Sequence, residues 1–125
     1  MIGNETIGKL EPDNLVFDSK FPLDVKSVTL SPRQGVIKRG TVIGILDDGK
    51  CVVWSGDDGI QADCILSDDL DTGTEGHSRA PVVGTAYRSG HFIKQALIVA
   101  EGSELTAAAE DELRKGGIYL SSAVM

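Results

Sequence analysis

The sequence has few aromatic residues, few cysteines and a deficit of positive charge, and each shortage narrows the classes of protein it can be. Aromatic residues make up 5% of the 125 positions, so a core must be built mainly from Val, Ile, Leu and Ala. Lys and Arg number 12 against 19 Asp and Glu, which gives a net charge of −7. Because phosphate binding needs a surplus of cations, we expect no direct nucleic-acid partner.

Long apolar runs are also missing. No run reaches the roughly 18 residues that a membrane span needs, and the first 14 residues lack the basic and apolar regions of a signal peptide. We therefore expect synthesis in a reducing cytoplasm and no membrane partner. Cys51 and Cys64 lie in apolar, strand-like runs without the spacing of a redox pair or a zinc site, so we expect two buried thiols.

Short β-branched runs separated by turns dominate the rest of the chain. The expected strands are 23–30, 40–46, 50–54, 62–66, 81–88, 92–99 and 118–124. Turns rich in Asp and Gly follow several of them, and Asp-Gly supplies the positive φ angles of tight hairpins. This spacing is typical of a small barrel or sandwich. The predicted fold class is mainly β, with a minor α+β character and one compact domain.

Two details of these strands are predicted from local pattern. In 23–30 the apolar period of two slips near Lys26–Ser27, which a β-bulge would explain. The strands 81–88 and 92–99 are expected to form a hairpin, with Ser89-Gly90-His91 as its turn.

One short helix is expected near the C-terminus. Thr106 can cap it, three alanines follow, and Gly116-Gly117 can end it. Its expected apolar face consists of Leu105, Ala108, Ala109 and Leu113.

The first 20 residues are predicted to form an N-terminal arm, with a single β-rich domain over 21–125. The segment has few large apolar residues, and only Leu15, Val16 and Phe17 form a small apolar group. Three interpretations stay open: a frayed terminus, a segment that orders on a partner, or a short stretch that covers the domain's own core.

The sequence offers little for catalysis or metal binding. His77 and His91 lie in polar turns, and Ser78 adjoins His77 too directly to pair with it as a nucleophile. The acidic loop 67–80 begins like a calcium loop at Asp69 and Asp71 but places glycine one position early and ends on alanine. We therefore predict no catalytic residue, no metal, no cofactor and no enzyme.

Four stretches, taken in order, resemble the lambda-type bacteriophage head decoration family. They are residues 37–44 (IKRGTVIG), 62–71 (ADCILSDDLD), 81–92 (PVVGTAYRSGHF) and 112–120 (ELRKGGIYL). The resemblance covers about residues 23–125. It implies a β-rich homotrimer on the outer surface of the expanded phage head, assembled in the host cytoplasm, with an N-terminal arm that orders against the major capsid protein.

On that resemblance the predicted capsid contact is residues 7–20 of the arm, with Leu15, Val16 and Phe17 as anchors. The predicted trimer surface is Ile118, Tyr119 and Leu120, for which ordinary core packing is the alternative. Two other functions stay open. One is a small cellular β-barrel binding module, and the other is a minor hydrolase subunit, which would need His77, His91 and the loop 67–80 to converge on one pocket.

Overall fold

The structure, a computed structural model, describes residues 15–16, 23–32, 34–57, 59–73 and 81–122. These residues form short strands, one 3₁₀ turn and one α-helix. The strands are β1 (Asp24–Leu30), β2 (Val36–Ile37), β3 (Val42–Ile45), β4 (Cys51–Val53), β5 (Gln61–Leu66), β6 (Leu70–Asp71), β7 (Val82–Ile93) and β8 (Ile118–Ser121). The helical segments are η1 (Lys94–Ala96) and α1 (Ala107–Lys115).

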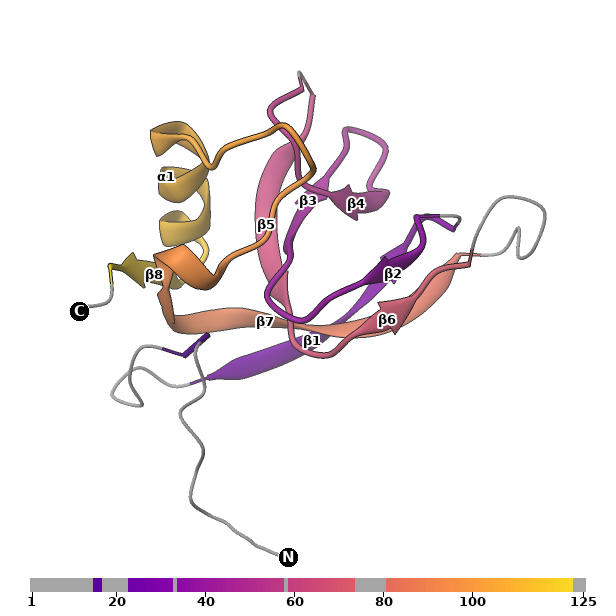
Figure 1. The fold of residues 1–125 in the computed structure, drawn as a ribbon, viewed down its shortest axis with the longest axis horizontal. Helices are drawn as coiled ribbons and strands as arrows, with labels where there is room; N and C mark the ends of the chain where they lie inside the picture. Colours follow the sequence, from indigo (N-terminus) through magenta and orange to yellow (C-terminus); the bar gives the residue numbers. More distant parts are fainter. Residues whose placement is uncertain (1–14, 17–22, 33, 58, 74–80, 123–125) are drawn as a thin grey trace, which may run out of the picture.

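Five strands close into a small β-barrel, which confirms the predicted fold class (Figure 1). Their order is β1-β4-β3-β5-β7, and β7 pairs with β1 to complete the ring. The β8 strand adds to β7 in parallel, after the crossover through α1. Strands β2 and β6 form a separate two-stranded sheet at the end of the molecule away from α1 (Figure 1).

The core is mostly aliphatic, as the scarcity of aromatic residues requires, and it also contains Phe92 and Trp54. Its largest fully buried side chains include Phe92, Leu30, Ile43 and Ile65. Cys51 and Cys64 are free thiols buried in the same cluster, so the prediction that they act as small apolar residues is confirmed.

The predicted hairpin at 81–99 is wrong, because β7 is one continuous strand from Val82 to Ile93 and the expected strand 92–99 gives way to a 3₁₀ turn at Lys94–Ala96. Gly90 lies inside it with φ +147°. A Cβ atom at Gly90 would lie 2.6 Å from Cδ2 of Leu23 and 2.8 Å from Cζ of Phe92. Close packing and the backbone angle therefore require glycine at this position, and no turn is involved. Neither requirement can be recognised from the neighbouring residues in the sequence.

The predicted bulge near Lys26–Ser27 is also misplaced, since the register shift between β1 and β7 falls between Asp24 and Val25. Lys26 lies opposite the buried Ala86, on the barrel side of the strand. Its Nζ is 2.7 Å from Oδ2 of Asp63. The alternation of apolar residues in β1 is interrupted at position 26, because this inward-pointing site holds a lysine that pairs with Asp63.

The helix begins and ends where the sequence predicts. Thr106 Oγ1 accepts a hydrogen bond from the Ala109 amide at 3.1 Å, and Gly116 follows the last turn. Ala109 and Leu113 are buried, but Ala108 is exposed, which corrects the predicted apolar face. The buried face follows a spacing of four residues through Leu105, Ala109 and Leu113, and Ala108 lies about 100° away from Ala109.

Candidate interaction surfaces

The first candidate surface is the point where the predicted arm joins the barrel. The Ile93 amide donates a hydrogen bond to the Leu15 carbonyl at 2.7 Å, and Val16 forms an antiparallel bridge with Phe92. Leu15 is only 4% exposed and belongs to the core, whereas Val16 is half-buried. Phe17 lies outside the described residues. Leu15 therefore anchors the preceding chain to β7, as the core-covering interpretation predicts for this residue.

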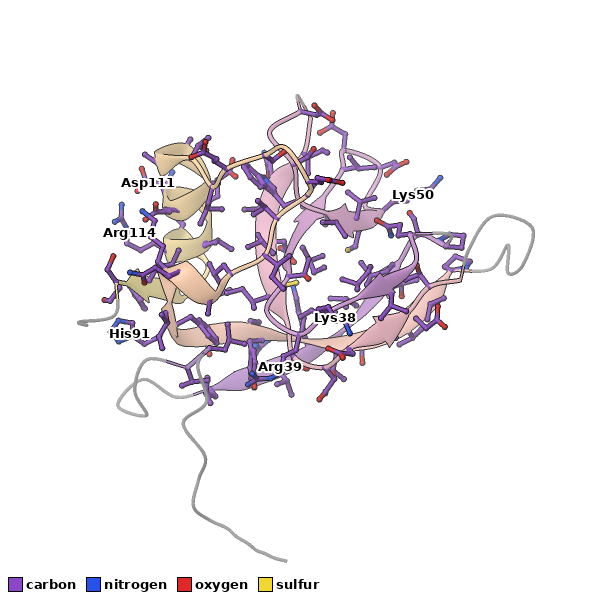
Figure 2. The ribbon with its side chains drawn as sticks, in the orientation of Figure 1. Lys38, Arg39, Lys50, His91, Asp111 and Arg114 are labelled. Atoms are coloured by element: carbon purple, nitrogen blue, oxygen red, sulfur yellow. The ribbon has the colours of Figure 1, made fainter. Side chains whose placement is uncertain are left out.

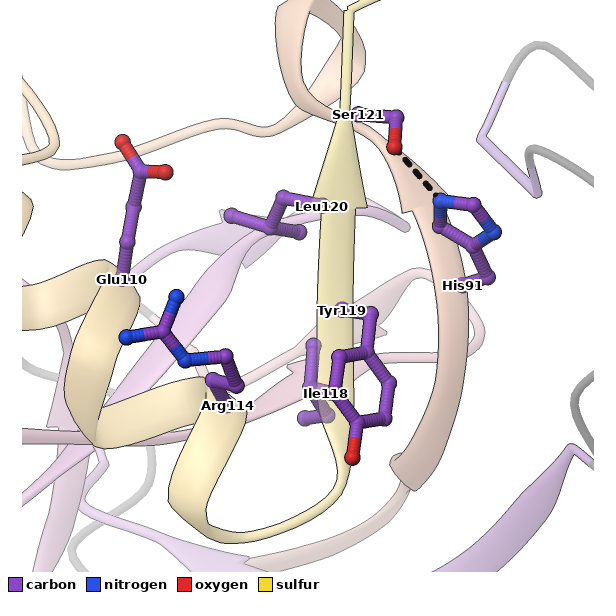
Figure 3. Close-up of a pocket in the computed structure, with 7 residues that line it drawn as sticks. All are labelled: His91, Glu110, Arg114, Ile118, Tyr119, Leu120 and Ser121. Atoms are coloured by element: carbon purple, nitrogen blue, oxygen red, sulfur yellow. Dashed lines mark hydrogen bonds between the residues drawn. The ribbon is translucent and has the colours of Figure 1, made fainter.

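The second candidate surface is β8 and the adjoining face of α1. Ile118 is buried in the core, Tyr119 is 38% exposed, and Leu120 is half-buried. A concave site of about 310 Å³ opens between the helix and the strand. Figure 3 shows Glu110 and Arg114 on the helix side, and Leu120 and Tyr119 on the strand. Of the three residues predicted for a trimer surface, Tyr119 and Leu120 are thus accessible.

Charged and polar groups surround this concave site. Glu110 pairs with Lys94 at 2.7 Å, and Arg114 pairs with Asp111 on the same helix. Nε2 of His91 lies 2.7 Å from Oγ of Ser121, a hydrogen bond that ties β7 to β8 (Figure 3). An apolar floor with a polar rim is typical of a protein–protein contact.

The enzyme alternative required both histidines and the loop 67–80 at one pocket. His77 and Ser78 lie outside the described residues, and the described part of the loop, 67–73, does not line the site that holds His91. Within that part, Leu70 and Asp71 form β6 and pair with Ile37 and Val36 of β2. The sequence presented this segment as a plain surface loop.

The acidic side chains of this loop are engaged with the backbone. Oδ1 of Asp69 accepts a hydrogen bond from the Arg39 amide at 2.7 Å, and Oδ1 of Asp71 accepts one from the Gly73 amide at 2.8 Å. Among the described residues, no group of three or more His, Cys, Asp or Glu side chains is placed to hold a metal ion. In the same described ranges, no helix has the length and apolar character needed to cross a membrane.

The thiols of Cys51 and Cys64 have low reactivity. Burial, followed by the charge of Asp63, raises the pKa of both the Cys64 and the Cys51 thiols. A thiol with a raised pKa holds its proton at neutral pH and is a weak nucleophile and metal ligand. For Lys26, burial lowers the pKa, but the hydrogen bond to Asp63 and electrostatic interactions with Cys64, Asp63 and Cys51 raise it above its ordinary value.

A third concave surface lies at the β2 end of the molecule. It has a volume of about 410 Å³ and is lined by Val36, Val53, Ile98 and Val99 among others. Val36 is 56% exposed and Ile98 is 41% exposed. Lys38, labelled in Figure 2, lies on its rim. This surface could not be predicted from the sequence, because Val36 and Ile98 come from segments far apart in the chain.

The described residues thus form a small closed β-barrel with concave surfaces at β8 and at β2, and its two buried thiols keep their protons at neutral pH. The family model for bacteriophage lambda head decoration protein D matches residues 5–118 of the chain. The chain therefore belongs to this family of structural phage proteins, which decorate the capsid surface of the virion. A comparison with curated proteins found no match.

Proposed function

We propose that the protein binds the expanded phage head as trimers and stabilises the shell against the pressure of packaged DNA. The observation that carries the proposal is the family match, which covers residues 5–118 and so includes all five barrel strands. Its partner is the major capsid protein, and its place is the outer surface of the head after assembly in the host cytoplasm. Bridging several shell subunits adds contact area where the shell would otherwise separate.

The proposed capsid contact is residues 7–20 of the arm, with Leu15, Val16 and Phe17 as its anchors. The backbone bond between Leu15 and Ile93 supports a fixed exit point for the arm. An arm that adds a strand to a sheet edge of the capsid protein would bind through backbone hydrogen bonds, which make modest demands on sequence. Expansion of the head would create that edge.

The proposed trimer surface is the β8 strand with Ile118, Tyr119 and Leu120. In this arrangement Ile118 holds the strand in the core, while Tyr119 and Leu120 meet the neighbouring copy. Aromatic side chains are enriched in interfaces because they bury a large area at little entropic cost. Three linked copies also gain avidity, because the second and third capsid contacts become intramolecular.

Co-sedimentation of the purified protein with expanded and unexpanded heads tests the proposal. We expect binding to expanded heads only, and trimers by light scattering. A variant lacking residues 1–14 keeps the buried Leu15, so it should stay folded and trimeric but lose head binding. Full binding by this variant would refute the role of the arm, and absence of binding by the intact protein would refute the function.

A further inference from the structure

A small concave site lies between the first turn of α1 and the residues that follow β4 (Figure 1). It has a volume of about 150 Å³. We call it the Trp54 site, and the residues that line it include Trp54, Ser55, Asp57, Ile60, Ala108 and Glu112. None of these residues belongs to the proposed arm or to the proposed trimer surface, so the site stands apart from both proposed contacts.

The indole N–H of Trp54 is a donor without a partner in the wall of this site. Trp54 is 3% exposed, and of the described residues only this one has a buried side-chain nitrogen or oxygen atom, Nε1, without a hydrogen-bond partner. A buried donor without an acceptor lowers the stability of the folded protein, because the donor has lost its hydrogen bonds to water. An oxygen atom bound at Nε1 would remove that cost.

The packing of Trp54 against Ile60 places the N–H edge of the indole on the side of the site. A Cβ atom added to Gly44 would lie 2.4 Å from Cγ2 of Ile60 and 3.2 Å from Cδ1 of Trp54. Cδ1 is the ring carbon bonded to Nε1, so the N–H edge lies beside Ile60. Because Ile60 also lines the site, a shift of its side chain would open Nε1 to a ligand.

The first turn of α1 adds a second donor. Thr106 satisfies the Ala109 amide through its hydroxyl at 3.1 Å and the Glu110 amide through its carbonyl at 3.0 Å. The amides of Ala107 and Ala108 have no acceptor within the helix, as in the first turn of any helix. Ala108 lines the Trp54 site, so its amide and the indole N–H both suit an oxygen acceptor.

Two carboxylates decide which kind of acceptor fits. Oε1 of Glu112 accepts a hydrogen bond from the Ala62 amide at 2.9 Å, which leaves Oε2 able to accept another. Asp57 also lines the site, and the described lining residues include no Lys or Arg. An anion would be repelled by these carboxylates, and a ketone or ether would offer no donor to Oε2. An amide group meets both demands, because its oxygen accepts hydrogen bonds and its N–H donates one.

We infer that the Trp54 site binds one neutral amide group, with its oxygen at the Trp54 indole and the Ala108 amide and its N–H at Glu112. The size of the site agrees, since pockets for drug-sized ligands have volumes of roughly 300–1,000 Å³ and this one has about 150 Å³. Small free amides, Asn and Gln side chains and peptide units all present this group. The inference goes beyond the proposed function and does not depend on it.

The chain has a single tryptophan, so the isotope-labelled protein gives one indole signal in a nitrogen–proton NMR spectrum, and that signal reports on this site. We expect acetamide to move the indole signal and the Ala108 amide signal along one saturable curve. Acetate has nearly the same shape but a negative charge, and it should bind about tenfold more weakly or worse.

Two further ligands identify the source of the group. N-methylacetamide has the single N–H of a peptide unit, so binding as tight as that of acetamide indicates a peptide unit, and weaker binding indicates a primary amide. A blocked Gly-Gln-Gly peptide that binds more tightly than both assigns the group to a polypeptide and not to a free amide.

Variants show which side chains hold the ligand. Glu112→Gln keeps an oxygen for the Ala62 amide but loses the second acceptor, so it should weaken acetamide binding by about fivefold or more. The matched control is Glu104→Gln, at an exposed glutamate outside the site, which should bind within about twofold of the intact protein. Ile60→Ala uncovers the N–H edge and should bind acetamide more tightly. Thermal unfolding checks that each variant stays folded.

The inference is supported if acetamide gives a saturable shift that Glu112→Gln weakens and that acetate does not reproduce. It is overturned if acetate binds as tightly as acetamide, or if Glu112→Gln binds acetamide as Glu104→Gln does. It is also overturned if neither the intact protein nor Ile60→Ala shows a saturable shift of the indole signal.

Discussion

Strand β1 is held in the barrel by two neighbours, which hold it in different ways. Along β7 it pairs through its whole length, from Asp24 with Ser89 to Leu30 with Val82. Along β4 it makes a single parallel pair, Leu30 with Cys51, among the described residues. The Ser31 amide adds one hydrogen bond to the Cys51 carbonyl at 3.0 Å.

We call the pairing of β1 with β7 the long joint and the pairing of β1 with β4 the short joint. At the short joint, a side chain supplies hydrogen bonds that a longer strand pair would otherwise make. Oε1 of Gln34 accepts a hydrogen bond from the Val53 amide at 3.1 Å, and Nε2 of Gln34 donates to the Ser31 carbonyl at 2.6 Å. The long joint depends on the backbone, which mutation leaves in place. The short joint depends partly on one glutamine, so it can be weakened alone.

Leu30→Ala should give the largest effect, because Leu30 is fully buried and belongs to both joints. The loss of its side chain leaves a cavity, and we expect a cost of about 3 kcal/mol in the free energy of unfolding. Urea denaturation measures this. Leu23→Ala, at an exposed leucine, serves as control and should cost less than about 1 kcal/mol. Similar costs for the two variants would contradict the role of Leu30.

Gly90→Ala probes the long joint at the point where β7 changes partner from β1 to β8. The new Cβ would meet the buried Phe92 ring, and the φ angle of +147° is unfavourable for alanine. We expect the free energy of unfolding to fall by about 2–3 kcal/mol. Gly49→Ala has a φ of +89° but nothing within 4 Å, so it should lose only about 1 kcal/mol. Equal losses would mean that the backbone angle alone matters.

Gln34→Ala should weaken the short joint and lower the free energy of unfolding by about 1 kcal/mol. The Val53 amide would lose its acceptor, so its hydrogen exchange should accelerate, while amides between β1 and β7 keep their protection. The matched control is Gln61→Ala, at an exposed glutamine of β5. Uniform acceleration throughout β1 would show that the two joints open together.

Alkaline pH acts on groups close to both joints, and its effect on stability is small until the pH passes about 9. The folded protein raises the pKa of Cys64 above 9.0, so the unfolded chain releases this proton first and stability falls as pH rises above about 9. Because the pKa of Lys26 is also raised in the folded protein, stability falls further as pH rises above about 10.5. Unfolding measured between pH 8 and 11 should show a shallower decline for Cys64→Ala. An unchanged slope would contradict this origin.

Local sequence signals predicted much of the fold. The Asp-Gly turns, the β-branched runs and the Thr106 cap depend on neighbours within a few residues, and the corresponding strands and helix are confirmed. The errors came from distant contacts. Gly90 resembles a turn residue until Leu23 and Phe92 are seen against it, and Lys26 disrupts the strand pattern until Asp63 is seen to pair with it.

The interaction surfaces were less predictable. Leu15 was identified as an anchor, but its place in the barrel core depends on a bridge to β7 some 75 residues away in the chain. The exposed side of β1 was not predicted, because the apolar pattern of 23–30 alone does not show that Val25 points outward. With the register known, the uncharged positions 25, 27 and 29 fall on one side of the sheet.

The length of β7 also decides how the molecule would carry a mechanical load. The strand is bonded to Leu15 and Val16 at one end and runs without a break along β1 to the other end of the barrel. Tension on the chain before Leu15 would first load the hydrogen bond between Leu15 and Ile93 and the bridge between Val16 and Phe92. Beyond these contacts the pairing of β1 with β7 would resist it as shear among many backbone hydrogen bonds. The β1–β7 pairing therefore spreads a pulling force over the length of the barrel, whereas the contacts of Leu15 and Val16 meet that force first.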